Sequence, residues 1–177
     1  MRKLILSSLT VLLLTGLTLT VAAQQQRLSP HEQVSITVGR NKITITYGRP
    51  YMKGRKIFGG LEAYDKVWRT GADEATTLET TADLQIGGLS VPKGTYALFT
   101  IPGQNGWKLI VNKTAKQWGA FEYKQADDLG RVDMKVTRTA QPVEQFTISL
   151  SAGGPDQAVL TLAWENTSAN VAIKVLP

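Results

Sequence analysis

Hydrophobic and polar residues alternate with a period of two along most of the chain after residue 33. Val34, Ile36 and Val38 alternate with polar residues, the stretch 39–42 (Gly-Arg-Asn-Lys) has turn character, and the alternation resumes over 43–47. In a β-strand, alternate side chains point to opposite faces, so this pattern gives each segment one apolar face. The sequence therefore predicts a β-hairpin at residues 34–47.

The same alternation recurs to the end of the chain, separated by turn signals such as Asn105-Gly106 and Gly-Gly-Pro-Asp at 153–156. No stretch of ten or more residues has helical periodicity, although 59–66 and 114–120 could each form one short helical turn. We predict a single all-β domain, an antiparallel β-sandwich of the jelly-roll or immunoglobulin-like kind, with about nine or ten short strands. Further strands are expected at 75–81, 84–86, 96–101, 107–113, 132–136, 146–150, 159–164 and 171–175.

The first 23 residues have the organisation of a secretory signal peptide. Arg2 and Lys3 precede an apolar run over residues 4–21, and small residues close it before Gln24. We expect a signal peptide at 1–23, a flexible leader at 24–32 and the domain at 33–177. An uncleaved membrane anchor is the alternative, because about 18 apolar residues can just cross a bilayer.

The absence of cysteine changes what the fold and its chemistry can rely on. No disulfide holds the domain, no thiol nucleophile exists, and a lipid-modified N-terminal cysteine is excluded. We expect an exported protein, periplasmic or extracellular, that is not a lipoprotein and does not span the membrane once the signal is cleaved. The length after cleavage suits one domain with one core.

The net charge of +6 is distributed unevenly. Residues 33–61 contain Arg40, Lys42, Arg49, Lys53, Arg55 and Lys56 and no carboxylate. Such a local field favours an anionic ligand, although a solvated basic face without a partner fits the pattern as well. We expect no nucleic-acid partner, because no nucleic-acid-binding module is present.

The segment 49–76 interrupts the β pattern with closely spaced polar and aromatic residues. One interpretation is a structural clasp, in which Arg69 and Glu74 pair across a turn at Gly71 while Arg49 and Arg55 bind backbone carbonyls. The other is a ligand site, because long loops with specific polar residues often carry function. The guanidinium fork suits a carboxylate or phosphate, and a carbohydrate is the other small ligand we consider. The candidate ligand-binding residues are Arg49, Lys53, Arg55, Trp68, Arg69 and Glu74.

Aromatic residues enter this hypothesis in two ways. Trp68 would stack on a flat ligand or a sugar ring, whereas the competing interpretation places Trp68 and Phe58 in the core. Trp107, Trp118 and Trp164 are expected to pack within the domain. Two tryptophans exposed on one face would instead indicate a carbohydrate platform.

A catalytic role is the rival hypothesis, with Glu74 as the general acid or base of a hydrolase acting on an envelope glycan or ester. Asp73 is a poor second carboxylate, because neighbours in a strand point to opposite faces unless a turn reorients them. A purely structural protein is the third hypothesis. We predict no cofactor and no metal site, since the only histidine, His31, lies near the N-terminus and no cysteine is available.

The motifs of this chain resemble those of a bacterial exported family called domain of unknown function 2911. The resemblance rests on RPYMKGRKIFG, VWRTGADEAT, PKGTYALFTIP and WKLIVNK, and it extends over essentially the whole chain after the signal. The family pattern has asparagine at the position of Asp73, while the residues at Glu74, Arg49 and Arg69 match. The resemblance implies an exported, β-rich domain and no established activity.

Overall fold

The computed structural model describes residues 29–177. The expected signal peptide at 1–23 therefore lies outside the described residues. The first strand begins at His31, within the stretch 24–32 that we expected to be a leader. No helix within residues 29–177 is long and apolar enough to cross a bilayer.

The described chain is almost entirely β-structure, as the alternating pattern predicts. All nine strands are paired antiparallel, and no α-helix occurs in residues 29–177, where the only helical element is the 3-10 turn η1 (Gln125–Asp127). The strands are β1 (His31–Val38), β2 (Asn41–Gly48), β3 (Thr76–Thr80), β4 (Leu84–Ile86), β5 (Leu89–Val91), β6 (Gly94–Ile101), β7 (Trp107–Asn112), β8 (Asp128–Gly154) and β9 (Gln157–Val175).

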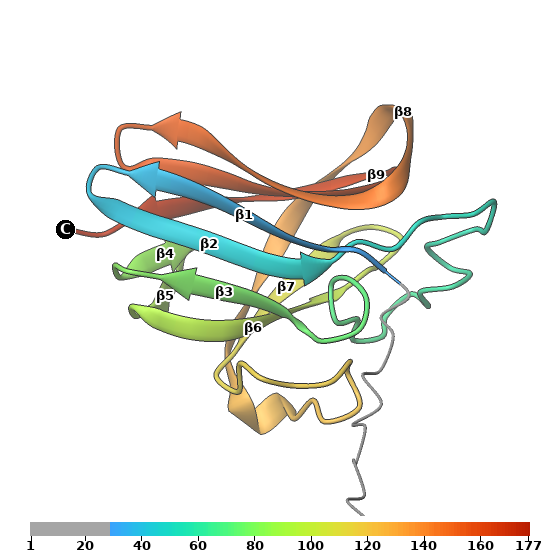
Figure 1. The fold of residues 1–177 in the computed structure, drawn as a ribbon, viewed down its shortest axis with the longest axis horizontal. Helices are drawn as coiled ribbons and strands as arrows, with labels where there is room; N and C mark the ends of the chain where they lie inside the picture. Colours follow the sequence, from blue (N-terminus) through green and yellow to red (C-terminus); the bar gives the residue numbers. More distant parts are fainter. Residues whose placement is uncertain (1–28) are drawn as a thin grey trace, which may run out of the picture.

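Hydrogen bonding links the strands in the order β1-β2-β3-β6-β7-β8-β9-β4-β5. The first part of β8 pairs with β7, and from Lys135 onward β8 pairs with β9. Register shifts between Arg138 and Thr147 interrupt the β8–β9 ladder, and β8 is strongly bent (Figure 1). Where the sequence predicts two short strands, at 132–136 and 146–150, the structure has one long bent strand.

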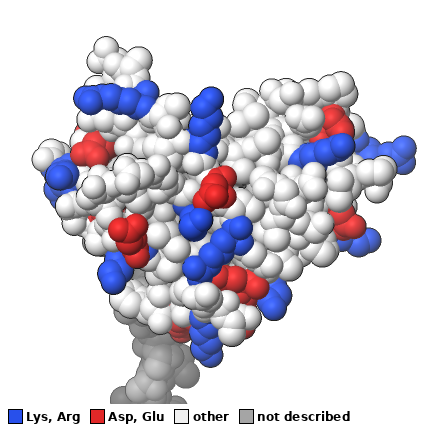
Figure 2. All heavy atoms as spheres, turned by 180° about the vertical axis from the view of Figure 1, so that it is seen from behind, with Lys and Arg blue, Asp and Glu red and all other residues white. Residues whose placement is uncertain are grey.

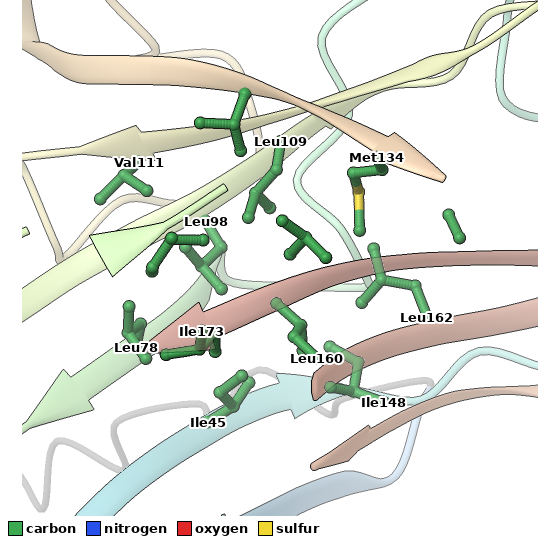
Figure 3. Close-up of a cluster of buried hydrophobic side chains, with 14 of the residues drawn as sticks. Ile45, Leu78, Leu98, Leu109, Val111, Met134, Ile148, Leu160, Leu162 and Ile173 are labelled. Carbon is green, nitrogen blue, oxygen red and sulfur yellow. The ribbon is translucent and has the colours of Figure 1, made fainter. Parts of the chain in front are cut away.

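The strands form two layers, one of β1, β2, β3, β6, β7 and the first part of β8, and the other of the rest of β8 with β9, β4 and β5. The core lies between them (Figure 3). Ile45, Leu78 and Leu98 face it from β2, β3 and β6, while Leu160 and Ile173 face it from β9, and all five are no more than 1% exposed. Each of these positions belongs to an alternating segment, so the period-two pattern correctly identified the buried face. Burial of this continuous apolar layer replaces the disulfides that the chain lacks.

Candidate functional site

The segment between β2 and β3 forms a long irregular loop that extends beyond the ends of β1 and β2 (Figure 1). Its first half is attached to the β8–β9 hairpin by two carboxylates. Glu144 accepts from the backbone N–H of Lys53 at 2.9 Å, and Glu165 accepts from those of Ile57 and Phe58 at 3.3 and 3.4 Å. These contacts satisfy backbone donors that no strand partner satisfies, so the loop has a defined conformation.

Arg49 is a structural residue at the start of this loop. Its Nε donates to the carbonyl of Phe146 at 3.1 Å, its Nη2 donates to Thr147 Oγ1 at 2.9 Å, and its Nη1 pairs with Glu32. The guanidinium therefore joins the end of β2 to β1 and β8. This is the clasp that the sequence suggested for Arg49, and it leaves this side chain engaged with protein.

Arg55 also binds backbone carbonyls, but it does so beside a pocket. Its Nε donates to Met52 O at 2.8 Å and its Nη2 to Tyr51 O at 2.6 Å. A pocket of about 320 Å³ lies next to it, lined among others by Lys53, Arg55 and Arg69. We call this the loop pocket; three of the six predicted ligand-binding residues meet there.

Arg69 has a buried donor atom without a partner beside the loop pocket. The backbone before it is fixed by a two-way bridge, in which Trp68 and Thr100 exchange N–H···O bonds of 2.8 and 2.9 Å. Within residues 29–177, the Arg69 guanidinium makes no hydrogen bond or ion pair, and its Nε is buried without an acceptor. A buried donor without an acceptor costs free energy.

Glu62 is the titratable group of the loop pocket, and it was not among the candidates drawn from the sequence. Burial raises the pKa of Glu62 to about 7, although the charges of Arg69 and Arg55 lower it. The carboxyl therefore changes charge near neutral pH. When Glu62 is neutral, the cations that line the pocket are less compensated.

Trp68 belongs to the core and not to the pocket. It is 3% exposed, stacks on Trp164 at 5.8 Å between ring centroids, and meets Phe58 and Phe146 edge to face. Its Nε1 donates to Gly71 O at 3.1 Å. The ring has no free face for a ligand, so the competing placement of Trp68 and Phe58 in the core is the observed one.

The expected pairing of Arg69 with Glu74 does not occur. Between them the backbone takes left-handed conformations at Thr70 (φ 57°) and Asp73 (φ 63°). Gly71 lies so close to β2 that a Cβ would be 2.8 Å from the Gly48 carbonyl oxygen. This tight turn directs Arg69 to the loop pocket and Glu74 to a different cleft, a separation that spacing along the sequence cannot show.

His31 lies between the two neighbouring carboxylates. Its Nε2 is 3.2 Å from Asp73 Oδ2 and 3.4 Å from Glu74 Oε2. With Asp73 in a left-handed conformation both carboxylates reach His31, but Asp73 lines the loop pocket and Glu74 lines a different cleft, so the two do not flank one site. We expected His31 to lie in a flexible leader, but β1 begins at this residue, and only an extension of the strand pattern back to His31 would have located it here.

The cleft that contains Glu74 has a volume of about 550 Å³. It is bounded by the start of β1, the end of β2, the start of β3 and the segment 115–118, and we call it the edge cleft. Glu74 and His31 both line it. Within residues 29–177, no group of three or more His, Asp or Glu side chains has an arrangement that can hold a metal ion.

The comparisons with known proteins give a family and no activity. No curated protein and no solved structure matches the chain. The family model described as "Protein of unknown function (DUF2911)" matches residues 29–173, which is most of the sequence and nearly all of the described fold. The chain therefore belongs to the DUF2911 family.

Proposed function

We propose that this protein is an exported, noncatalytic binding module whose loop pocket takes a small anionic ligand with a carboxylate or phosphate group. The observation that carries the proposal is the Arg69 guanidinium, whose Nε is buried without an acceptor in a pocket that Lys53 and Arg55 also line. A guanidinium offers donors in a planar fork that matches the oxygens of a carboxylate or phosphate. An anion in the pocket would supply the missing acceptor.

The surrounding structure supports this assignment. The Arg55 guanidinium donates hydrogen bonds to the carbonyls of Met52 and Tyr51. These two bonds hold the Arg55 side chain against the exposed loop. Glu144 holds the Lys53 backbone. These contacts fix the Arg55 side chain and the backbone of Lys53 in advance, so less conformational entropy is lost when an anion binds. On the face shown in Figure 2, basic and acidic side chains are interspersed, so no broad basic surface competes there for the same ligand.

The proposal is tested by calorimetric titration of inorganic phosphate and of citrate into the purified protein at low ionic strength. Arg69→Gln and Lys53→Gln should each weaken binding about tenfold or more, since a hydrogen bond to a charged group is worth about 1.5–3 kcal/mol. Lys108→Gln is the matched control, because it removes the same charge at a surface ion pair with Asp133, away from the pocket. If Lys108→Gln weakened binding equally, the loss would come from the change in net charge and not from the loop pocket, and the proposal would fail.

A hydrolase is the second candidate, and the contact between His31 and Glu74 favours it. The two side chains lie 3.4 Å apart in one cleft, and they would have to approach to about 2.6–3.2 Å in a substrate complex to exchange a proton. Glu74 would then act as general acid or base on an envelope glycan or ester. Turnover of such a substrate that disappears in Glu74→Gln, with folding intact, would replace the noncatalytic assignment. If the protein bound no anion and turned over no substrate in these tests, the purely structural hypothesis would be retained.

A further inference from the structure

We propose that the edge cleft is a second binding site, separate from the loop pocket, and that it takes a neutral sugar ring. Its volume of about 550 Å³ lies within the range of roughly 300–1,000 Å³ that is usual for small-molecule sites. The turn at residues 70–73 separates the two sites, with Asp73 lining the loop pocket and Glu74 lining the edge cleft.

The first observation is the exposure of one tryptophan. Trp118 lines the edge cleft and is 42% exposed, whereas Trp68, Trp107 and Trp164 are at most 4% exposed. An indole that is kept at the mouth of a cleft presents a flat apolar face to a ligand. The C–H face of a sugar ring is a flat, weakly polar partner of suitable size.

The second observation is an acceptor without a donor in the cleft wall. Gln117 is only 5% exposed, and its Nε2 donates to Asn112 Oδ1 at 3.0 Å and to Thr114 O at 2.5 Å. Both partners are acceptors, so this network fixes the amide orientation. The Oε1 atom is left buried with no donor in the described residues.

The wall that carries these residues is well ordered by its own contacts. The Asn112 side chain holds the chain on both sides of residues 115–118. Its Nδ2 donates to Lys124 O and Asp128 Oδ1, and its Oδ1 accepts from the N–H of Thr114. The backbone N–H of Ala75 in turn donates to Gln117 O at 3.0 Å. The cleft is therefore formed in advance of any ligand.

The chemistry of the lining selects the ligand class. Gln117 Oε1 is a buried acceptor without a donor in the described residues, so a matching ligand brings a donor. The Glu74 carboxylate in the same cleft disfavours an anion, and a purely apolar ligand would leave Gln117 Oε1 buried without a donor. A ring with hydroxyl groups can donate to Gln117 Oε1 while its flat face covers Trp118.

The test is titration of the purified protein with three neutral trisaccharides, cellotriose, chitotriose and maltotriose, followed by calorimetry and by tryptophan emission. We expect at least one to bind. Trp118→Ala should weaken that binding about tenfold or more, the scale of a lost aromatic anchor. Trp118→Phe should keep measurable heat of binding while the change in emission disappears, because the other three tryptophans are buried.

Two controls make the result specific. Phe121→Ala removes an aromatic ring that is 87% exposed and follows Trp118 closely in the sequence but does not line the cleft, and it should leave sugar binding unchanged. Arg69→Gln should also leave it unchanged, so failure of the anion proposal would not decide this one. Absence of binding for all three sugars would overturn the proposal, and so would equal losses in Trp118→Ala and Phe121→Ala.

Discussion

Nε2 of His31 lies 3.2 Å from Oδ2 of Asp73, although the two residues are 42 positions apart in the chain. The contact joins the first residue of β1 to the end of the long loop. Asp73 has a left-handed backbone (φ 63°), and Asp73 and Glu74 line different cavities. The two proposed sites thus share a wall that depends on this one turn.

Substitutions at Asp73 should separate backbone conformation from charge. Asp73→Asn should change the free energy of unfolding by less than about 1 kcal/mol, because asparagine tolerates a positive φ and can still bond to His31. Asp73→Ala should cost about 1–2 kcal/mol, since alanine is strained in the left-handed region. Urea unfolding of the two variants measures the difference. Equal losses would show that the charge of Asp73, and not its backbone, stabilises the turn.

Arg49 should be important for stability and not for binding. Arg49→Ala removes donors to Phe146 O and Thr147 Oγ1 as well as the ion pair with Glu32, and we expect a loss of about 2–3 kcal/mol. The anion affinity of the loop pocket should be unchanged at temperatures where the variant is folded. Chemical denaturation and calorimetry test both halves. A loss below about 0.5 kcal/mol would contradict the clasp.

Trp68 gives a complementary case. Because it is buried among Phe58, Phe146 and Trp164, Trp68→Ala should destabilise the protein by about 3–5 kcal/mol. Trp68→Phe should cost less and should bind anions as the unsubstituted protein does. The stacking hypothesis drawn from the sequence would be restored if Trp68→Phe folded normally and lost binding.

Glu62 should make both stability and anion binding depend on pH. Its pKa of about 7 lies above the ordinary 4.5, so between these values the folded protein holds a proton that the unfolded chain releases. The free energy of unfolding therefore falls as the pH rises through this window, by about 3 kcal/mol. Glu62→Gln should match the unsubstituted protein near pH 4 and be more stable than it above pH 7.

The ionisation of Glu62 also determines how the anion affinity of the loop pocket changes with pH. Above pH 7 the Glu62 carboxylate competes with an anion for the cations of the loop pocket, so phosphate or citrate should bind more tightly as the pH falls below 7. Citrate itself takes up protons at acid pH, so its own protonation must be measured in parallel. The affinity of Glu62→Gln for citrate at each pH is the reference. A Glu62→Gln protein with the same pH dependence of affinity would contradict this role.

The alternation of apolar and polar residues correctly predicted most strands and turns. The hairpin expected at 34–47 is β1–β2, and the turn at 153–156 connects β8 and β9. Period-two alternation reports which face of a strand is buried, and that information is local. The single 27-residue β8 was missed because its middle, residues 137–145, is polar and has irregular register, so the alternation is broken there.

The sequence could predict which residues belong to the candidate site but not how they are arranged in space. The sequence showed that Lys53, Arg55 and Arg69 lie in one loop, and the structure brings them to one pocket. It could not show that Thr70 and Asp73 adopt left-handed conformations, which separate Arg69 from Glu74. His31 and Glu62 were missed because their importance arises from contacts and burial across the fold, which no spacing along the chain reports.

The most direct measurement is the NMR signal of the Arg69 Nε–H group during titration with phosphate. This donor is buried without an acceptor, so an anion in the loop pocket should shift its resonance, and the shift should saturate. The Nε–H of Arg49, which already donates to Phe146 O, is an internal control that should not move. Saturable movement of the Arg69 signal alone is the predicted result. A signal that stays in place at saturating phosphate and citrate would contradict the assignment of this loop as an anion site.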